Sequence, residues 1–266
     1  MNRKELHLAG LIVPPPTPFK RDLEIDEKAL AGHLGFLAEK GVTRLLINGT
    51  TAEFFSLLPP ERRRLLVCAR RCFPGTILFN TAADSLFQSL EAVKWAEDLG
   101  ADAVVAMAPY YYAGAPWTGL LEYFKKIESS TDLPFLLYNF SRHTGNPITP
   151  DILEKVRHAG IKDSSGDLSL IPHTSCYLAG TSRQVVEAFM KGAKGFVSSL
   201  ANIEPGLYVS LEKLLNDGDM DGAGKIQDEI IERCGKVDPS NEISSLKKRL
   251  SSLIEGYPPA VRLPLI

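Results

Sequence analysis

The sequence has no surplus of basic residues, since 30 lysines and arginines stand against 32 aspartates and glutamates and the formal net charge is -2. Binding to a phosphate backbone or an anionic membrane surface needs clustered positive charge. We therefore expect neither nucleic acid nor a membrane as a partner. No stretch approaches the ~20 consecutive apolar residues of a membrane-spanning helix, and the first apolar run is too short for a secretory signal. A cytoplasmic location is the resulting expectation.

Cysteine is scarce, with 4 residues in a chain of 266. These thiols do not form the disulfide framework of a small secreted protein. Cys68 and Cys72 lie one helical turn apart, but no histidine or further thiol nearby completes a metal site. The five histidines are scattered, and no glycine-rich phosphate motif follows the first predicted strand. The sequence therefore predicts neither a metal nor a nucleotide cofactor.

Short runs of aliphatic and β-branched residues alternate with longer amphipathic segments along the chain. This alternation is typical of repeated strand-helix units around a parallel sheet. Strands are predicted at residues 11–13, 44–48, 76–80, 103–106, 135–138, 160–162, 177–179 and 195–198. Helices are predicted at residues 26–39, 60–72, 85–99, 117–129, 150–157, 182–191 and 205–216. Eight such units in about 200 residues favour an α/β fold of the closed (β/α)8 or TIM barrel type over an open sheet.

Several predicted helices have recognisable first residues. Asp26 and Asp84 are placed to accept hydrogen bonds from the first backbone amides of their helices. Pro60, Pro150 and Pro205 suit the first helical turn, where a missing N–H is not needed.

The strand rhythm ends near residue 218. We expect a barrel at residues 1–218 and a small helical appendix at 219–266, with helices at 221–234 and 240–254. The appendix is predicted to pack on the barrel or on a neighbouring subunit, with solvated helices as the alternative. The sixth unit is predicted to be truncated, because only residues 168–174 separate its strand from the next one.

Lys162 stands at the end of a short apolar stretch, the sixth predicted strand. In barrels of this kind the catalytic groups come from the carboxyl ends of the strands and the loops after them. An amine held out of water there favours its neutral form and can condense with a carbonyl group. The alternative is an ordinary solvated lysine at a strand end, and this stretch alone does not exclude it.

Polar groups also follow other predicted strands. After the second strand, Gly49 allows a sharp turn, and the hydroxyls of Thr50 and Thr51 with their amides can hold a small carboxylate; a purely structural turn is the alternative. Tyr111 follows the fourth strand and Tyr138 ends the fifth. Phenols there can move protons if a partner such as Thr51 is hydrogen-bonded to them, or they can pack at the barrel rim.

Five segments, taken in chain order, carry a resemblance to a known family. They are Asn48-Gly49-Thr50-Thr51-Ala52-Glu53, Pro109-Tyr110-Tyr111, Tyr138-Asn139-Phe140 with Thr144-Gly145, Gly160-Ile161-Lys162-Asp163, and Gly192-Ala193-Lys194-Gly195 with Ala201-Asn202. Together they resemble the dihydrodipicolinate synthase and N-acetylneuraminate lyase family over nearly the whole predicted barrel. The resemblance implies a pyruvate-dependent class I aldolase or lyase that requires no metal or other cofactor.

The same resemblance implies roles for individual residues. Lys162 would form a Schiff base with the keto carbon of pyruvate, while Thr50 and Thr51 would hold the pyruvate carboxylate. Tyr138 would move the proton. The backbone near Val197, on the eighth strand, would make a further contact to bound pyruvate.

The resemblance also implies an oligomer. In family members a tyrosine of the Pro-Tyr-Tyr segment reaches into the site of a neighbouring subunit, and Tyr111 aligns with it, coupled through Thr51. We therefore expect a homodimer or a homotetramer.

Substrate choice is where the chain departs from the lysine-pathway synthases. Those enzymes carry an arginine in the loop after the strand-five tyrosine, where this chain has His143, preceded by Arg142 and by Ser141 in place of the usual proline. The segment after Lys162, with Ser165, is more similar to that of sugar-acid aldolases, whose small hydroxylated residues suit a polyol chain. We expect cleavage of a 2-keto-3-deoxy sugar acid to pyruvate and an aldehyde.

Two alternatives stay open. The first is a 4-hydroxy-tetrahydrodipicolinate synthase that uses Arg142 in condensing pyruvate with aspartate semialdehyde. The second is a non-catalytic barrel that binds a keto acid, suggested by the departures at Ala52, Ser141 and His143.

Overall fold

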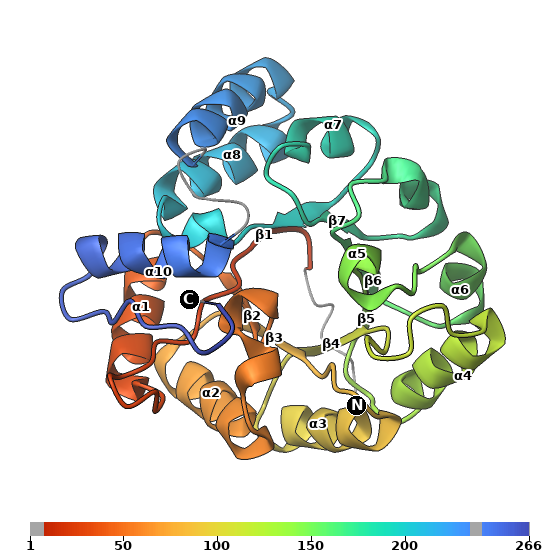
Figure 1. Cartoon of the computed structure of the whole chain (residues 1–266). Helices are drawn as coiled ribbons and strands as arrows, with labels where there is room; N and C mark the ends of the chain where they lie inside the picture. The colour runs from red at the N-terminus through yellow and green to blue at the C-terminus, as the bar shows by residue number, and fades with distance from the viewer. Residues whose placement is uncertain (1–7, 235–240, 266) are drawn as a thin grey trace. The chain divides into compact units, whose positions relative to one another are not determined.

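Eight strands alternate with helices along the chain, in a computed structural model that describes residues 8–234 and 241–265 (Figure 1). The strands are β1 (Gly10–Ile12), β2 (Arg44–Ile47), β3 (Thr76–Asn80), β4 (Ala103–Met107), β5 (Phe135–Asn139), β6 (Gly160–Asp163), β7 (Tyr177–Ala179) and β8 (Gly195–Val197). They form one sheet in the order β1-β8-β7-β6-β5-β4-β3-β2. Val13, directly after β1, pairs in parallel with Leu45 of β2, which joins the two ends of that order. The predicted (β/α)8 barrel and all eight strands are confirmed.

The helices also follow the prediction. They are α1 (Glu27–Glu39), α2 (Pro59–Cys72), α3 (Leu86–Asp98), α4 (Trp117–Glu128), α5 (Ser141–Thr144), α6 (Pro150–Lys155), α7 (Val185–Met190), α8 (Pro205–Asp217), α9 (Met220–Cys234) and α10 (Glu242–Leu253). Only the short helix α5 was not predicted. The sixth unit is truncated as expected, since the 3-10 helix η3 (Leu168–His173) is the only helical element in the described connection from β6 to β7.

One of the two predicted aspartate caps is present. The side chain of Asp26 accepts a hydrogen bond from the backbone N–H of Ala29 at 2.9 Å, which satisfies one free amide at the start of α1. The prediction for Asp84 is wrong. Helix α3 begins at Leu86, so the cap position belongs to Ser85, whose hydroxyl accepts from the backbone N–H of Gln88 at 3.3 Å.

The chain packs as two compact units, which are residues 1–10 with 78–197 and residues 11–77 with 198–266. In the first unit, β4 and β5 are buried along their whole length, as expected for parallel strands covered on both faces. Helices α4 and α6 lie on the outer side of these strands (Figure 1). The register pairs Met107 with Tyr138, Tyr138 with Lys162 and Lys162 with Leu178. The carboxyl ends of these strands are therefore level.

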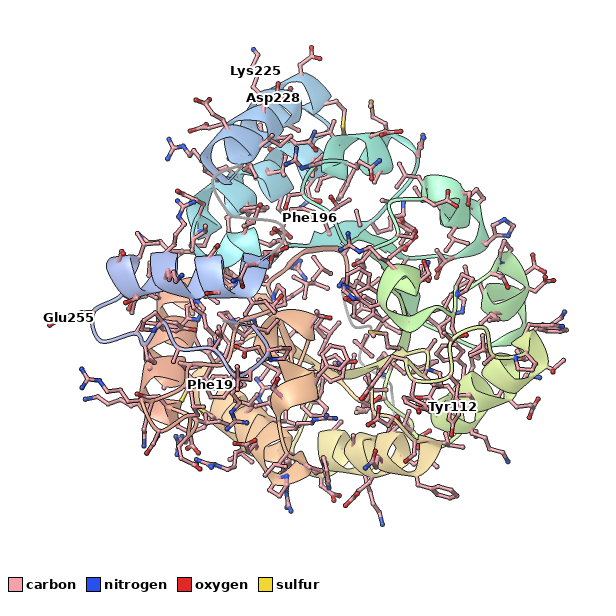
Figure 2. All side chains as sticks on the ribbon, in the orientation of Figure 1. Phe19, Tyr112, Phe196, Lys225, Asp228 and Glu255 are labelled. Carbon is pink, nitrogen blue, oxygen red and sulfur yellow. The ribbon has the colours of Figure 1, made fainter. Side chains whose placement is uncertain are left out.

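The second unit contains β1, β2 and the helices α1, α2, α8, α9 and α10. Helices α8 and α9 pack side by side, and Lys225 and Asp228 project from α9 into solvent (Figure 2). Helix α10 buries Leu246 and Leu250, so the two C-terminal helices are packed rather than solvated. The division at residue 218 stays a prediction. In the described part of the chain, no helix combines the length and the apolar character that crossing a membrane requires.

His33 of α1 gives this second unit a specific sensitivity to acid. Burial lowers the pKa of His33 from 6.5 to about 3, against a smaller opposing effect of the Asn202 backbone. Between these two pH values the unfolded chain binds a proton at His33 that the folded chain does not bind. The contribution of His33 to stability is therefore lost as the pH falls through that window, by at most about 1.4 kcal/mol per pH unit.

We predict that the free energy of unfolding of the parent falls more steeply between pH 6.5 and pH 4 than that of a His33→Phe variant. Urea unfolding at a series of pH values measures both slopes. His173→Phe, at a half-buried histidine of η3, controls for the loss of any histidine. Equal slopes in the parent and His33→Phe would contradict the assignment.

Candidate active site

Lys162 and Tyr138 form a buried pair at the carboxyl ends of β6 and β5. The two residues are register partners across the parallel strands. Lys162 is 9% exposed and Tyr138 is 1% exposed. The Lys162 Nζ atom lies 3.7 Å from the centroid of the Tyr138 ring and 5.9 Å from that of Phe140. An aromatic face stabilises a positive charge placed over it. Lys162 is thus an amine against aromatic rings, and the alternative of a solvated strand-end lysine is wrong.

A line of aromatic and basic side chains continues from this pair onto helix α5. The Tyr138 and Phe140 rings stack with centroids 5.9 Å apart, and the His143 ring meets Phe140 edge-on at 4.2 Å. The Arg142 guanidinium carbon lies 5.4 Å from the same Phe140 ring. Partial burial and the positive charge of Arg142 lower the pKa of His143, so its imidazole is neutral at pH 7. Helix α5 therefore presents one cation and one neutral imidazole beside Phe140, on exposed residues.

The segment after Lys162 is held by the buried carboxylate of Asp163. Its Oδ1 atom accepts from the Asn139 side-chain amide at 3.0 Å and from the Ser165 backbone N–H at 2.8 Å, while Oδ2 accepts from the Tyr177 hydroxyl at 3.0 Å. Burial, together with the charge of Asp163, raises the pKa of Tyr177 far above its usual range, so the phenol stays a donor. Asp163, the last residue of β6, thereby connects to Asn139 at the end of β5 and to Tyr177 at the start of β7. Sequence reasoning missed this network.

The loop after β6 lies close to the end of β7. Gly180 donates its backbone N–H to the Asp163 carbonyl at 2.7 Å, and a Cβ atom on Gly180 would lie 2.3 Å from the Ser164 hydroxyl. Only glycine fits there. Ser165, a predicted substrate contact, is exposed on this loop, and its hydroxyl accepts from the Asp167 backbone N–H at 3.1 Å.

In the second unit, Thr50 and Thr51 form the 3-10 turn η1 (Thr50–Ala52) directly after β2. The buried hydroxyl of Thr17 donates to the Ala52 carbonyl at 2.7 Å and fixes the end of this turn. Both threonines are half-buried. The predicted sharp turn is therefore present, with two hydroxyls and successive backbone amides on a short, tied segment.

Two further predicted site residues differ in their surroundings. Val197 is buried at the end of β8. Tyr111 is 78% exposed and meets Tyr112 edge-on with ring centroids 5.3 Å apart, in contrast to the buried pair of Lys162 and Tyr138. Among the described residues, no three histidine, cysteine, aspartate or glutamate side chains are grouped closely enough to hold a metal ion.

A sequence model of the dihydrodipicolinate synthetase family matches residues 7–266. The chain belongs to this family. The members are class I, pyruvate-dependent aldolases and lyases, and the protein is an enzyme of that class.

Relatives cover nearly the whole chain. The 4-hydroxy-tetrahydrodipicolinate synthase of an Exiguobacterium species is 30% identical over 274 residues, which cover 97% of this chain and 92% of the relative. A solved dihydrodipicolinate synthase of Acinetobacter baumannii, complexed with pyruvate, has a TM-score of 0.88 and 27% identity and covers 97% of this chain and 93% of its own. A 2-keto-3-deoxygluconate aldolase of Sulfolobus sulfataricus has a TM-score of 0.87 and 26% identity, with 97% and 90% covered. The protein is thus similar to a synthase and to a sugar-acid aldolase.

Removing the Asp163 carboxylate is predicted to destabilise the protein strongly. An Asp163→Ala variant leaves the donors of Asn139, Ser165 and Tyr177 without this acceptor, and we expect a loss of about 2–4 kcal/mol in the free energy of unfolding. Tyr177→Phe is the matched control, because it removes one of these hydrogen bonds and should cost about 1 kcal/mol. Urea unfolding measures both. An Asp163→Ala variant as stable as the parent would show that the network does not hold the strand ends.

Proposed function

We propose that the enzyme cleaves a 2-keto-3-deoxy sugar acid to pyruvate and an aldehyde, with Lys162 as the amine that forms the Schiff base. The observation that carries the proposal is the position of this amine, buried at a strand end and 3.7 Å from the centroid of the Tyr138 ring. A nearly dehydrated amine can receive a carbonyl group without displacing much water. The ring face then favours the positive charge of the protonated imine.

The reaction follows from this arrangement. The neutral Nζ atom of Lys162 attacks the keto carbon to form a carbinolamine, and uptake of one proton with loss of the hydroxyl group as water gives a protonated imine. A base takes the proton of the 4-hydroxyl group, the bond between carbons 3 and 4 breaks, and its electron pair moves into the imine to form an enamine as the aldehyde leaves. The enamine takes up a proton at carbon 3, and water then releases pyruvate and the free amine. Tyr138 is the proposed proton carrier because its ring lies against Lys162.

The substrate carboxylate is assigned to the turn of Thr50 and Thr51. Hydroxyls and backbone amides can hold an anion without a fixed cation, and a cation beside Lys162 would oppose protonation of the imine. The backbone near Val197 is the second proposed contact. This assignment is supported by the geometry of the turn, whose short 3-10 helix presents successive amides.

Tyr111 is proposed to act in the site of a second copy of the chain. Its 78% exposure makes it available to a partner subunit, where Thr51 would couple it to the proton relay. A homodimer or homotetramer is therefore part of the proposal, as is a cytoplasmic location.

The choice of a sugar acid rests on the groups near Phe140 and after β6. The neutral imidazole of His143 and the hydroxyl of Ser165 are suited to hydroxyl groups rather than to a second carboxylate. The similarity to a 2-keto-3-deoxygluconate aldolase supports the same choice.

A second candidate, 4-hydroxy-tetrahydrodipicolinate synthase, is favoured by one observation. The Arg142 guanidinium carbon lies 5.4 Å from the Phe140 ring, so α5 offers a cation for the carboxylate of aspartate semialdehyde. Several relatives carry the name of this synthase.

A substrate panel separates the candidates. The enzyme is incubated with 2-keto-3-deoxygluconate, hydroxy-oxoglutarate and sialic acid while pyruvate release is measured, and with pyruvate plus aspartate semialdehyde while condensation is measured. We predict the highest kcat/KM for the keto-deoxy sugar acid. An Arg142→Ala variant should leave that value within about threefold, whereas Lys162→Ala should lower it by at least about 10³-fold.

The exposed lysine of α7 supplies the control, because Lys191→Ala removes an amine that forms only a surface ion pair with Glu187. It should keep the activity of the parent. Faster condensation with aspartate semialdehyde, lost in Arg142→Ala, would favour the synthase instead. If the parent turns over none of these substrates, the result would favour a non-catalytic barrel that binds a keto acid.

A further inference from the structure

The second unit contains a fully buried ion pair between Glu53 and Lys247. Both side chains are 0% exposed, and the Lys247 Nζ atom donates to Glu53 Oε1 and, at 2.8 Å, to the Ala260 carbonyl. The other carboxylate oxygen, Oε2, accepts from the backbone N–H of Arg262 at 2.9 Å. Both oxygens of Glu53 are therefore bound by the C-terminal part of the chain, one by helix α10 and one by the segment after it.

Arg262 makes a second connection from the same segment. Its guanidinium binds Glu61 through both oxygens, at 2.7 Å and 2.5 Å, and donates to the Ser56 carbonyl at 2.7 Å. The same guanidinium holds the pKa of Glu61 below its usual range. Because Glu61 also accepts from the Leu58 backbone N–H at 2.8 Å, this contact fixes the start of α2.

The Phe19 ring lies close to both cations. The Lys247 Nζ atom lies 4.3 Å and the Arg262 guanidinium carbon 4.4 Å from the centroid of its ring, which is labelled in Figure 2. An aromatic face stabilises cations that have given up their water. The ring thus keeps both basic groups in fixed positions.

The segment held by these groups is the one that carries the threonine turn. Glu53 is the residue directly after η1, and its backbone has a φ of 58° in the left-handed region. A residue other than glycine pays about 1–3 kcal/mol to stay there, so surrounding contacts must hold it. The Glu53 backbone is bonded to Thr50 and Ser56, whereas the contacts on its side chain come from Lys247 and Arg262. Without these two partners, the end of the turn loses the contacts that fix the Glu53 carboxylate.

Burying an ion pair is a poor way to gain stability, because the desolvation penalty can exceed the attraction between the charges. A buried carboxylate with fixed donors on both oxygens does define the direction of the backbone that carries it. The network is also balanced, since Glu53 and Glu61 face Lys247 and Arg262. It therefore shapes the turn without adding a net charge that would repel or trap an anionic substrate.

We propose that Lys247 and Arg262 are positioning residues for substrate binding, which hold Glu53 and Glu61 so that the turn of Thr50 and Thr51 keeps the shape that receives the pyruvate carboxylate. This inference rests on the proposed function, in which that turn binds the carboxylate. Helix α10 and the C-terminal segment are then parts of the binding machinery. Their role is exerted through Glu53 and not by contact with substrate.

The test compares two ketones in reductive trapping with borohydride. Pyruvate carries the carboxylate, whereas methyl pyruvate offers the same keto carbon without the negative charge. In a Lys247→Met variant, the concentration of pyruvate that gives half-maximal trapping should rise at least about tenfold, because the carboxylate site has lost its anchor. Trapping of methyl pyruvate should stay as in the parent. Lys248→Met, at the exposed neighbouring lysine of α10, should change neither.

A second variant separates a binding defect from a folding defect in case Lys247→Met does not fold. The double variant Glu53→Gln with Lys247→Met removes both charges, so it should recover the melting temperature while its half-maximal pyruvate concentration stays raised. Unchanged pyruvate trapping in a folded variant, or equal losses for pyruvate and methyl pyruvate, would overturn the inference. Absence of any adduct with pyruvate in the parent would instead overturn the proposed function.

Discussion

The pairing of Tyr138 with Lys162 across β5 and β6 is the constraint on which the proposed active site depends. A parallel register fixes which side chains share one level of the sheet, and here it places an amine over a phenol ring at the end of two buried strands. A shift of one residue would turn Lys162 to the other face of the sheet. The chemistry of the site therefore follows from the hydrogen bonding of the sheet, before any loop contributes.

Each compact unit contains one buried carboxylate that holds the segment beside a proposed functional group. Asp163, directly after Lys162, connects β6 to β5 and β7, and Glu53, directly after the threonine turn, binds the C-terminal segment. Asp163 follows Lys162 directly, and Glu53 lies two residues after Thr51. In both places a charge that is expensive to bury is fully hydrogen-bonded, which favours a role in fixing geometry over a role in stability alone.

The elements that the sequence predicts are those with a local signal. The buried strands are continuous apolar runs, and Lys162 is conspicuous as a lysine that ends one of them. Helix α5 was missed because four residues are too few to show a helical period. The partners of the buried carboxylates were missed because contacts across long separations leave no local pattern: Tyr177 is 14 residues from Asp163, and Lys247 is 194 residues from Glu53. The sequence also does not predict that Tyr111 and Ser165 are exposed.

The central claim is that the amine of Lys162 is the group that becomes covalently joined to the keto acid. Peptide mass spectrometry after borohydride reduction in the presence of pyruvate tests it most directly. We predict a single reduced pyruvate adduct on the peptide that contains Lys162, and none in a Lys162→Ala variant. An unmodified Lys162, or an adduct on another lysine that persists in that variant, would contradict it.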